Sequence, residues 1–449
     1  MLERRGVTLR RGSALLSVVC ESGGIVAGCW DGFPKARRGV RIRSRTSSST
    51  GGGMKIQFLF SAMVGLTFGL MASSCTSTPG ARSLAPAPIP AGRVEALVRR
   101  AAQNDSTALV IWKEGELVLE RWFDGEPRPI ESMSITKSVT ALAIGRLVTD
   151  GRLDSIDRPL SDWYPQWREG PKSGITLRHL LAHTSGLDPW FDRLRAEDPV
   201  AAVLDSPLVS SPGTRFEYNN AAIILLPAVV HRISGKPMDE LVRDEIFAPL
   251  GIRDFSWARA PNGIPYANAG LQIRPADLAR IGELLRNRGT WRGHEILSSA
   301  WIDEMLRPGT VEPTYGLLWW MEPTGELTFD TSTIPSGDPL RGILDPYSAR
   351  PLRFPDLYDT VAAALEPMGG LSLLDGSAHG GVLKWRRIED VAPIGFRANG
   401  WGGQNLIVLP DSGLIVVRMR EIRPGDTPEV IERYGFNDEL GWAVAHLLD

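Results

Sequence analysis

Four short runs of β-branched and aromatic residues stand out from the mixed pattern of apolar and polar positions along the chain. Residues 108–112 and 117–122 flank one four-residue polar turn, and residues 405–409 and 414–419 flank another near the opposite end. Paired runs of this length around turn residues are typical of β-hairpins. The pattern therefore predicts one hairpin at each end of the folded part of the chain.

Helical spacing of apolar residues dominates the sequence between these hairpins. One helix is expected to begin at Ser132 or Ser134 and to run to Asp150, with Gly151 as its C-cap. Strands at both ends with helices between them predict an α+β fold: one antiparallel sheet, built from both termini and flanked by helices, with a helical subdomain. The other expected helical segments span residues 180–181, 221–233, 238–250, 278–288, 298–306 and 437–448.

Residues 321–396 break this pattern. The stretch is rich in Pro and Gly and contains only one helix-like piece, residues 357–365. A structureless loop of that length is unusual inside a compact domain. We expect an insertion that is either functional or partly disordered.

The first part of the chain is rich in Arg, Ser and Gly up to residue 53. Met54 then opens an apolar run, residues 56–70, that is too short to span a bilayer comfortably and ends in small residues. Residues 54–75 therefore match a secretory signal peptide. We expect translation to begin at Met54, so that residues 1–53 are a mis-assigned extension; a disordered basic extension is the alternative.

The signal ends in a sequence that resembles a bacterial lipobox, in which a cysteine is lipidated and becomes the first mature residue. Ala72 stands where that motif usually has Leu, and Cys75 is the only cysteine after Met54, which excludes disulfides. Residues 76–92 have the composition of a flexible tether. We expect an exported, periplasmic protein, anchored to the membrane through lipidated Cys75, with a folded domain at 93–449.

Charge narrows the class of partner. Residues 1–74 hold eleven of the 50 basic and three of the 52 acidic residues, which leaves 39 and 49 and a net charge of −10. An acidic domain without a basic cluster disfavours nucleic acid as a partner. The composition does not indicate an oligomeric state.

Ser134 and Lys137 supply the first chemical motif. Residues three apart on a helix share a face, with side-chain origins about 5–6 Å apart. A hydroxyl and an amine placed in this way form an activated nucleophile, because the lysine steers or accepts the serine proton. In the first turn of a helix, free N–H groups and the helix dipole also favour developing negative charge.

Tyr218 and Asn220, read as Tyr-x-Asn, put a phenol and an amide on one loop. A phenol is a poor base at its ordinary pKa near 10, but a neighbouring ammonium such as that of Lys137 stabilises the phenolate. Tyr218 would then take the proton from Ser134, and Asn220 would hold the substrate carbonyl or Lys137. The alternative is a buried tyrosine beside a turn of two asparagines.

Gly400 and Trp401 lie in a glycine-rich segment just before the last hairpin. Acyl transfer needs two donors aimed at the oxyanion. The Ser134 N–H can be one, and a backbone N–H near Trp401, accessible because of the glycines, can be the other. The alternative is a glycine-rich bend that lets a strand turn a corner.

The region from about Thr107 to Arg420 resembles the β-lactamase-related serine hydrolases, which include class C β-lactamases, D-alanyl-D-alanine carboxypeptidases, esterases and 6-aminohexanoate-dimer hydrolases. The resemblance implies a β-lactamase/transpeptidase-like fold and an acyl-enzyme on Ser134, with Lys137 and Tyr218 handling protons and with no metal or other cofactor. Its landmarks, in order, are the Ser-x-x-Lys motif in residues 131–138, residues 175–187, the Tyr-x-Asn motif in residues 216–220, residues 246–252, and residues 269–271 ahead of 277–280.

One departure bears on the substrate. Where many members carry Lys-Thr-Gly or His-x-Gly before the last hairpin, this chain has Ala398-Asn399-Gly400, so the cation that would hold a β-lactam carboxylate is missing. Arg397 is a candidate substitute, although adjacent side chains on a strand point to opposite faces. The insertion at 321–396 is a candidate cover for the pocket.

The histidines give a weaker signal. His179 and His183 have the spacing of a zinc pair, but Leu180 stands where the general-base Glu of such a motif belongs. Helix–loop packing is the preferred interpretation. His379 has no identifiable partner, and no cofactor is expected.

These observations predict a serine hydrolase that acts through an acyl-enzyme on a small-molecule ester or amide. A β-lactamase or D-alanyl-D-alanine carboxypeptidase is one alternative. A binding or sensing lipoprotein that keeps the fold without turnover is the other. The sequence does not decide the substrate.

Overall fold

The computed structural model describes residues 88–374, 381–435 and 437–449. The expected extension, signal peptide and lipidated Cys75 lie outside these residues, as does His379, so those interpretations stay predictions. Helix α1 begins at Ala91, inside the stretch predicted to be tether. Within the described residues, no helix combines the length and the apolarity that crossing a bilayer requires.

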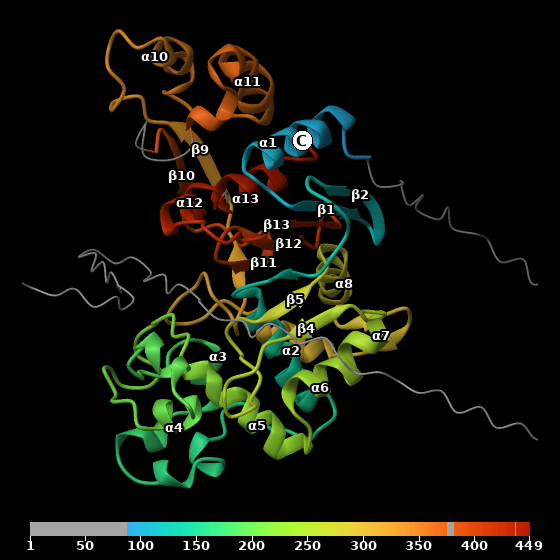
Figure 1. Cartoon of the computed structure of the whole chain (residues 1–449), viewed down its shortest axis with the longest axis vertical. Helices are drawn as coiled ribbons and strands as arrows, with labels where there is room; N and C mark the ends of the chain where they lie inside the picture. Colours follow the sequence, from blue (N-terminus) through green and yellow to red (C-terminus); the bar gives the residue numbers. More distant parts are fainter. Residues whose placement is uncertain (1–87, 375–380, 436) are drawn as a thin grey trace, which may run out of the picture. The chain divides into compact units, whose positions relative to one another are not determined.

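A six-stranded antiparallel sheet forms the centre of the fold, with strand order β2-β1-β13-β12-β11-β8 (Figure 1). It confirms the two predicted hairpins and the prediction that one sheet is built from both ends of the chain. The strands are β1 (Ala108–Lys113), β2 (Glu116–Trp122), β8 (Trp320–Glu322), β11 (Gly395–Gly400), β12 (Gln404–Leu409) and β13 (Leu414–Met419).

Both faces of this sheet are buried at its central strands β12 and β13. In β12, Leu406 and Val408 belong to one hydrophobic cluster, whereas Ile407 and Leu409 belong to the other. The same alternation continues in β13, because successive side chains on a strand point to opposite faces. The sheet therefore separates two cores, and each core has its own helices.

Helix α2 (Ile135–Thr149) and helix α8 (Pro275–Arg286) belong to the first core. Twelve of the fifteen residues of α2 are buried, so the helix is enclosed on nearly all sides, as expected of a helix inside a core. It contacts α5, α6 and α9, while α8 packs on β1, β12 and β13. The predicted helix at Ser134–Asp150 is confirmed, including Gly151, whose φ of 68° suits a residue just past a helix C-terminus.

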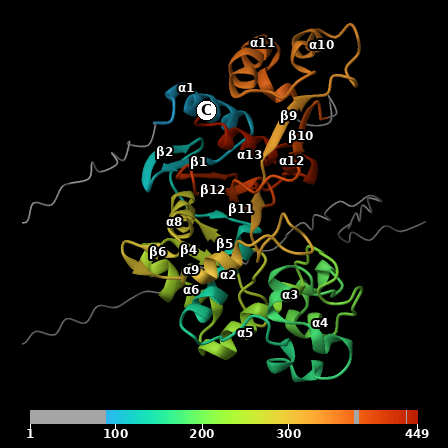
Figure 2. The same cartoon turned by 180° about the vertical axis from the view of Figure 1, so that it is seen from behind.

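The helical subdomain occupies the middle of the chain, as predicted, with a three-stranded sheet of order β3-β5-β4 beside it (Figure 2). The expected helix at 238–250 forms as α6 and α7 joined by a π-helical turn, Arg243–Phe247. The elements are α3 (Leu177–Leu181), α4 (Pro199–Leu204), α5 (Leu225–Ser234), α6 (Met238–Val242), α7 (Ala248–Leu250), α9 (Ser299–Met305), β3 (Ile130–Glu131), β4 (Phe255–Trp257), β5 (Leu271–Ile273), β6 (Thr290–Trp291) and β7 (His294–Glu295).

The described part of the insertion at 321–396 is folded, and it contains more helices and strands than the one helix-like piece expected at 357–365. Strands β9 and β10 pair with each other, and the insertion packs with α1 and α13 in the second core, across the sheet from α2 (Figure 1). The described insertion therefore does not cover the end of α2 that carries Ser134. The elements of this side are α1 (Ala91–Gln103), β9 (Gly325–Phe329), α10 (Pro339–Leu344), α11 (Ala362–Leu365), β10 (Leu383–Arg387), α12 (Pro428–Arg433) and α13 (Asn437–Ala445).

Gly145 in α2 gives a test of this packing. A Cβ at Gly145 would lie 2.0 Å from Trp301 Nε1 of α9. Alanine is better than glycine in a helix by about 1 kcal/mol, but forcing atoms into a filled core costs about 1–3 kcal/mol. We expect Gly145→Ala to lower the free energy of unfolding by about 1–2 kcal/mol in urea denaturation.

Gly92→Ala is the matched control, because Gly92 lies in α1 with no atom within 4 Å of its would-be Cβ. It should leave the free energy of unfolding unchanged or raise it by up to about 1 kcal/mol. Equal effects of the two substitutions would contradict the close α2–α9 contact.

Candidate active site

Ser134 is the N-cap residue of α2 and follows a strained turn. Met133 has a φ of 50°, which is uncommon for a residue other than glycine, and the Ser134 side chain makes no capping hydrogen bond. The Ser134 hydroxyl is therefore available for other contacts. Within the described residues, the Ser134 N–H has no hydrogen-bond acceptor, as the prediction of an oxyanion donor requires.

Lys137 lies one turn into the same helix, and its Nζ is 2.8 Å from Ser134 Oγ. The amine also donates to the backbone carbonyl of Asn268 at 3.0 Å. The residue is 1% exposed, and burial holds the pKa of Lys137 well below its ordinary value of 10.5. This arrangement favours a neutral amine in contact with the serine hydroxyl.

Tyr218 completes the predicted group. Its hydroxyl lies near enough to the Ser134 side chain to influence the pKa of the phenol, and Lys137 Nζ lies 4.8 Å from the centre of its ring. Burial raises the pKa of Tyr218 to about 12, against a smaller opposite effect of the Ser134 contact. The expectation that Lys137 stabilises a phenolate is therefore wrong: burial favours the neutral form of both side chains, because it penalises charge on either one.

Aromatic rings surround the phenol. The ring centre of His183 lies 4.5 Å from that of Tyr218, and Trp320 stacks on Tyr218 at 6.1 Å. Tyr315 packs edge-on against Trp320 at 4.6 Å. Trp319, by contrast, is fully buried against Phe396 in the first core. Of the two adjacent tryptophans, Trp320 is the one beside the site.

His179 and His183 both take part in packing between helix and loop, as the sequence analysis predicted, and each makes a hydrogen bond to a backbone N–H. His179 caps α3 by accepting a hydrogen bond from the Thr176 N–H, and His183 Nδ1 accepts one from the Asn219 N–H at 3.1 Å. Burial, with a smaller effect of nearby Lys137, lowers the pKa of His183 well below its ordinary value. In the part of the chain that the structure describes, no three metal-ligating side chains cluster.

The two asparagines after Tyr218 differ in their contacts. Asn219 is buried; its amide donates to the Leu187 carbonyl at 2.8 Å, and its side-chain oxygen accepts from the Ala222 N–H at 2.8 Å. Asn220 is half-buried, and its side chain makes no hydrogen bond to a described residue. Asn219 therefore shapes the loop that carries Tyr218, and Asn220 is free to contact a ligand.

The end of β11 lies against the nucleophile turn. A Cβ at Gly400 would lie 2.5 Å from the Ser132 carbonyl oxygen and 2.9 Å from Met133 Cβ, so only glycine permits this approach. Trp401 follows directly, in a turn whose next two carbonyls, of Gly402 and Gly403, accept hydrogen bonds from buried Arg418. The segment predicted to supply the second oxyanion donor is thus adjacent to Ser134.

Arg397 does not replace the missing cation. Its Nε lies 3.4 Å from Glu322 Oε2, and Asp438 of α13 is also within ion-pair distance. Ala398, its neighbour on β11, belongs instead to the first core together with α2. Arg397 therefore points to the α13 side of the sheet, away from the Ser134 side.

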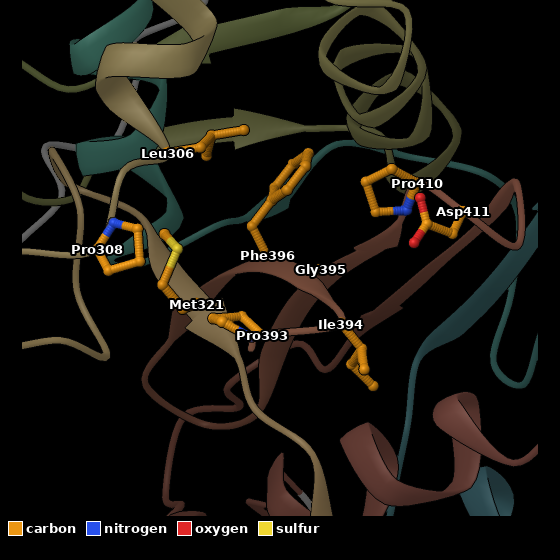
Figure 3. A pocket seen from close by; sticks show the side chains of 9 residues that line it. All are labelled: Leu306, Pro308, Met321, Pro393, Ile394, Gly395, Phe396, Pro410 and Asp411. Carbon is orange, nitrogen blue, oxygen red and sulfur yellow. The ribbon is translucent and has the colours of Figure 1, made fainter. Parts of the chain in front are cut away.

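A pocket of about 240 Å³ lies elsewhere and contains none of the predicted catalytic side chains (Figure 3). The candidate active site formed by Ser134, Lys137 and Tyr218 is identified instead by the contacts among these side chains and by the partial exposure of Ser134 and Tyr218. The pocket is lined by Leu306, Pro308, Met321, Pro393, Ile394, Gly395, Phe396, Pro410 and Asp411.

The sequence analysis did not identify two residues that make contacts in this site, Asn268 and Glu131. Asn268 acts through its backbone carbonyl, which no residue type reveals. Glu131 accepts hydrogen bonds from the N–H groups of Met133 and Gly270. Its position three residues before Ser134 was visible, but its partner in a loop more than 130 residues away was not.

Comparison with known proteins shows which family the chain belongs to. The family model described as "Beta-lactamase" matches residues 94–434. The chain therefore belongs to the β-lactamase family, and it is a hydrolase of that family.

Two curated relatives are an esterase, EstB, from Burkholderia gladioli and a 6-aminohexanoate-dimer hydrolase from Paenarthrobacter ureafaciens. The first is 34% identical over 150 residues, covering 28% of this chain and 38% of the esterase. The second is 23% identical over 246 residues, covering 49% of this chain and 62% of the hydrolase. The chain thus matches less than two thirds of the length of each.

Solved structures show the same fold. A crystal structure described as a putative β-lactamase from Bacteroides dorei aligns with a TM-score of 0.56 and 19% identity over 80% of this chain and 98% of that one. A putative 6-aminohexanoate-dimer hydrolase from Bacillus anthracis aligns with a TM-score of 0.52 and 18% identity over 78% of this chain and 80% of that one. The predicted α+β, β-lactamase/transpeptidase-like fold is confirmed.

The adjacent asparagines provide a test of the loop. Asn219→Ala leaves the Leu187 carbonyl and the Ala222 N–H without their partners, and an unsatisfied buried group costs about 1–3 kcal/mol. We expect Asn219→Ala to lower the free energy of unfolding by at least about 1 kcal/mol. Asn220→Ala, the matched control, should change it by less than about 0.5 kcal/mol. Urea denaturation checks both, and the reverse order would contradict the assignment.

Proposed function

We propose that this protein hydrolyses esters or small amides through an acyl-enzyme on Ser134. The observation that carries the proposal is the convergence of the Ser134 hydroxyl and the buried Lys137 amine, 2.8 Å apart, with the Tyr218 ring 4.8 Å from that amine. Family membership and the esterase among the relatives support it. A domain that only binds its ligand has no need for this combination.

Acylation begins with the Ser134 hydroxyl. Its proton passes to the neutral Lys137 amine as Oγ attacks the substrate carbonyl carbon, and the carbonyl oxygen becomes an oxyanion. The N–H groups of Ser134 and Trp401 are the proposed donors to that oxyanion. Asn220, free of internal hydrogen bonds, is the proposed contact to the rest of the substrate.

Tyr218 is the proposed acid for the leaving group. Because it stays a phenol at neutral pH, it donates its proton to the departing alkoxide or amine, and the Lys137 ammonium replaces that proton. A water then attacks the acyl carbon, Ser134 leaves with a proton, and the neutral amine and phenol are restored. The net reaction is ester or amide plus water to acid plus alcohol or amine.

The surroundings favour an uncharged acyl group. Ala398 stands where many family members have a cation, and Arg397 is paired on the other side of the sheet. Beside the phenol lie Phe216 and Trp320, two half-buried aromatic rings with centres 6.3 Å apart. A substrate carboxylate would lack a partner there, which argues against a β-lactam or a D-alanyl peptide as the preferred substrate.

Replacing the nucleophile tests the proposal. Wild type and Ser134→Ala are assayed with p-nitrophenyl acyl esters of graded length, nitrocefin and a linear amide dimer. We expect the wild type to hydrolyse the esters and to leave nitrocefin nearly intact. Ser134→Ala should lose at least about 10³-fold in kcat, because no group remains to form the acyl-enzyme. Full ester turnover by Ser134→Ala would refute the mechanism.

The pH dependence tests the roles of Lys137 and Tyr218. Below its lowered pKa, Lys137 holds a proton and cannot accept another, so kcat/KM should rise with pH and level off well below 10.5. It should then stay level up to the highest pH at which the enzyme remains folded, because Tyr218 keeps its proton until about pH 12. A rise that continues to pH 10.5 would show that Lys137 has an ordinary pKa and is not the base.

A further inference from the structure

Glu131 ends β3 and lies three residues before the nucleophile. Its Oε1 accepts two hydrogen bonds, from the Gly270 N–H at 2.7 Å and from the Met133 N–H at 3.2 Å. Both donors belong to residues with left-handed backbone, since φ is 94° at Gly270 and 50° at Met133. One carboxylate oxygen thus joins two tight turns from distant parts of the chain.

One of these turns leads into the proposed nucleophile, Ser134, and the other follows the residue that contacts the proposed base, Lys137. Met133 directly precedes Ser134, so its backbone sets where the serine hydroxyl begins. Gly270 follows two residues after Asn268, whose carbonyl oxygen lies 3.0 Å from Lys137 Nζ. The contact to Glu131 therefore connects the turn that holds the nucleophile to the loop that orients the base.

The position of the Glu131 carboxyl is energetically unfavourable for its charged form. Glu131 is half-buried, and this burial raises the pKa of its carboxyl to about 7. Within the described residues no Lys, Arg or His pairs with it; the two N–H groups are its hydrogen-bond donors. Withdrawing a carboxyl from water without a cationic partner reduces stability, so the two N–H contacts are what hold this side chain beside the nucleophile turn.

We propose that Glu131 is a positioning residue for the acyl-transfer reaction: its Oε1 sets the separation of Ser134 Oγ and Lys137 Nζ by holding the Met133 and Gly270 N–H groups together. This role rests on the proposed function of Ser134. It requires the reach and the acceptor oxygen of the side chain rather than its charge. A displacement of about 1 Å between reacting groups costs about 100-fold in rate.

Two substitutions separate reach from charge. Glu131→Gln keeps the length and an acceptor oxygen but removes the charge, so its kcat should stay close to that of the wild type. Glu131→Asp keeps the charge but is one methylene too short to meet both N–H groups. We expect its kcat on a p-nitrophenyl ester to fall about 10- to 100-fold with KM little changed, and the pre-steady-state acylation rate to fall in parallel.

Glu439→Asp is the matched control. Glu439 is a buried carboxylate on α13, and it accepts hydrogen bonds from Arg100 and Tyr358 across the sheet from Ser134. Its shortening should lower the free energy of unfolding and leave kcat unchanged. The comparison removes loss of stability as the explanation for a lower kcat in Glu131→Asp.

The outcomes are distinguishable. Wild-type kcat in Glu131→Asp, or equal losses in Glu131→Gln and Glu131→Asp, would overturn the positioning role and leave the proposed function intact. A wild-type protein that neither turns over any substrate of the panel nor becomes acylated at Ser134 would overturn both.

Discussion

The contact between Ser134 Oγ and the buried Lys137 amine is the constraint on which the rest of this site depends. A lysine in water is protonated at neutral pH and cannot take a proton from serine. Burial in α2, where most residues are enclosed by other helices, shifts the amine toward its neutral form. The Asn268 carbonyl satisfies one amine N–H without supplying a charge that would favour the ammonium.

The same burial decides the role of Tyr218. A phenol enclosed by His183, Tyr315 and Trp320 loses the water that would stabilise a phenolate, so it keeps its proton. Amine and phenol are therefore both favoured in their neutral forms beside the serine hydroxyl, as the proposed reaction requires. One environment produces both states, because desolvation acts against positive and negative charge alike.

The central sheet separates the chain into two sides, each with its own hydrophobic core. Its α2 side carries Ser134, Lys137, Tyr218 and the glycine-rich end of β11, which are the proposed catalytic group. Its other side carries α1, α13 and the insertion in a second core. Membership of the β-lactamase family accounts for the first side. On β11, Ala398 lies on the first side, whereas Arg397 pairs with Glu322 on the second side.

Local patterns in the sequence determined much of this protein. The two hairpins, the helix after Ser134, the Ser134–Lys137 spacing and the order of the family landmarks all depend on residues near one another in the chain, where periodicity and spacing are direct consequences of helix and strand geometry. The meeting of Tyr218 with Ser134, although its contact spans more than 80 residues, was also predictable, because the family resemblance supplied it.

Tertiary structure alone decided what depends on contacts between distant segments. Burial lowers the pKa of Lys137 and raises the pKa of Tyr218. The expectation of an ammonium beside a phenolate did not take this burial into account. The folding of the insertion onto α1 and α13 follows from the second core, and the bridge from Glu131 to Gly270 follows from the pairing of β3 with β5. Burial and long-range backbone contacts are properties of the assembled chain, so no local pattern of residues encodes them.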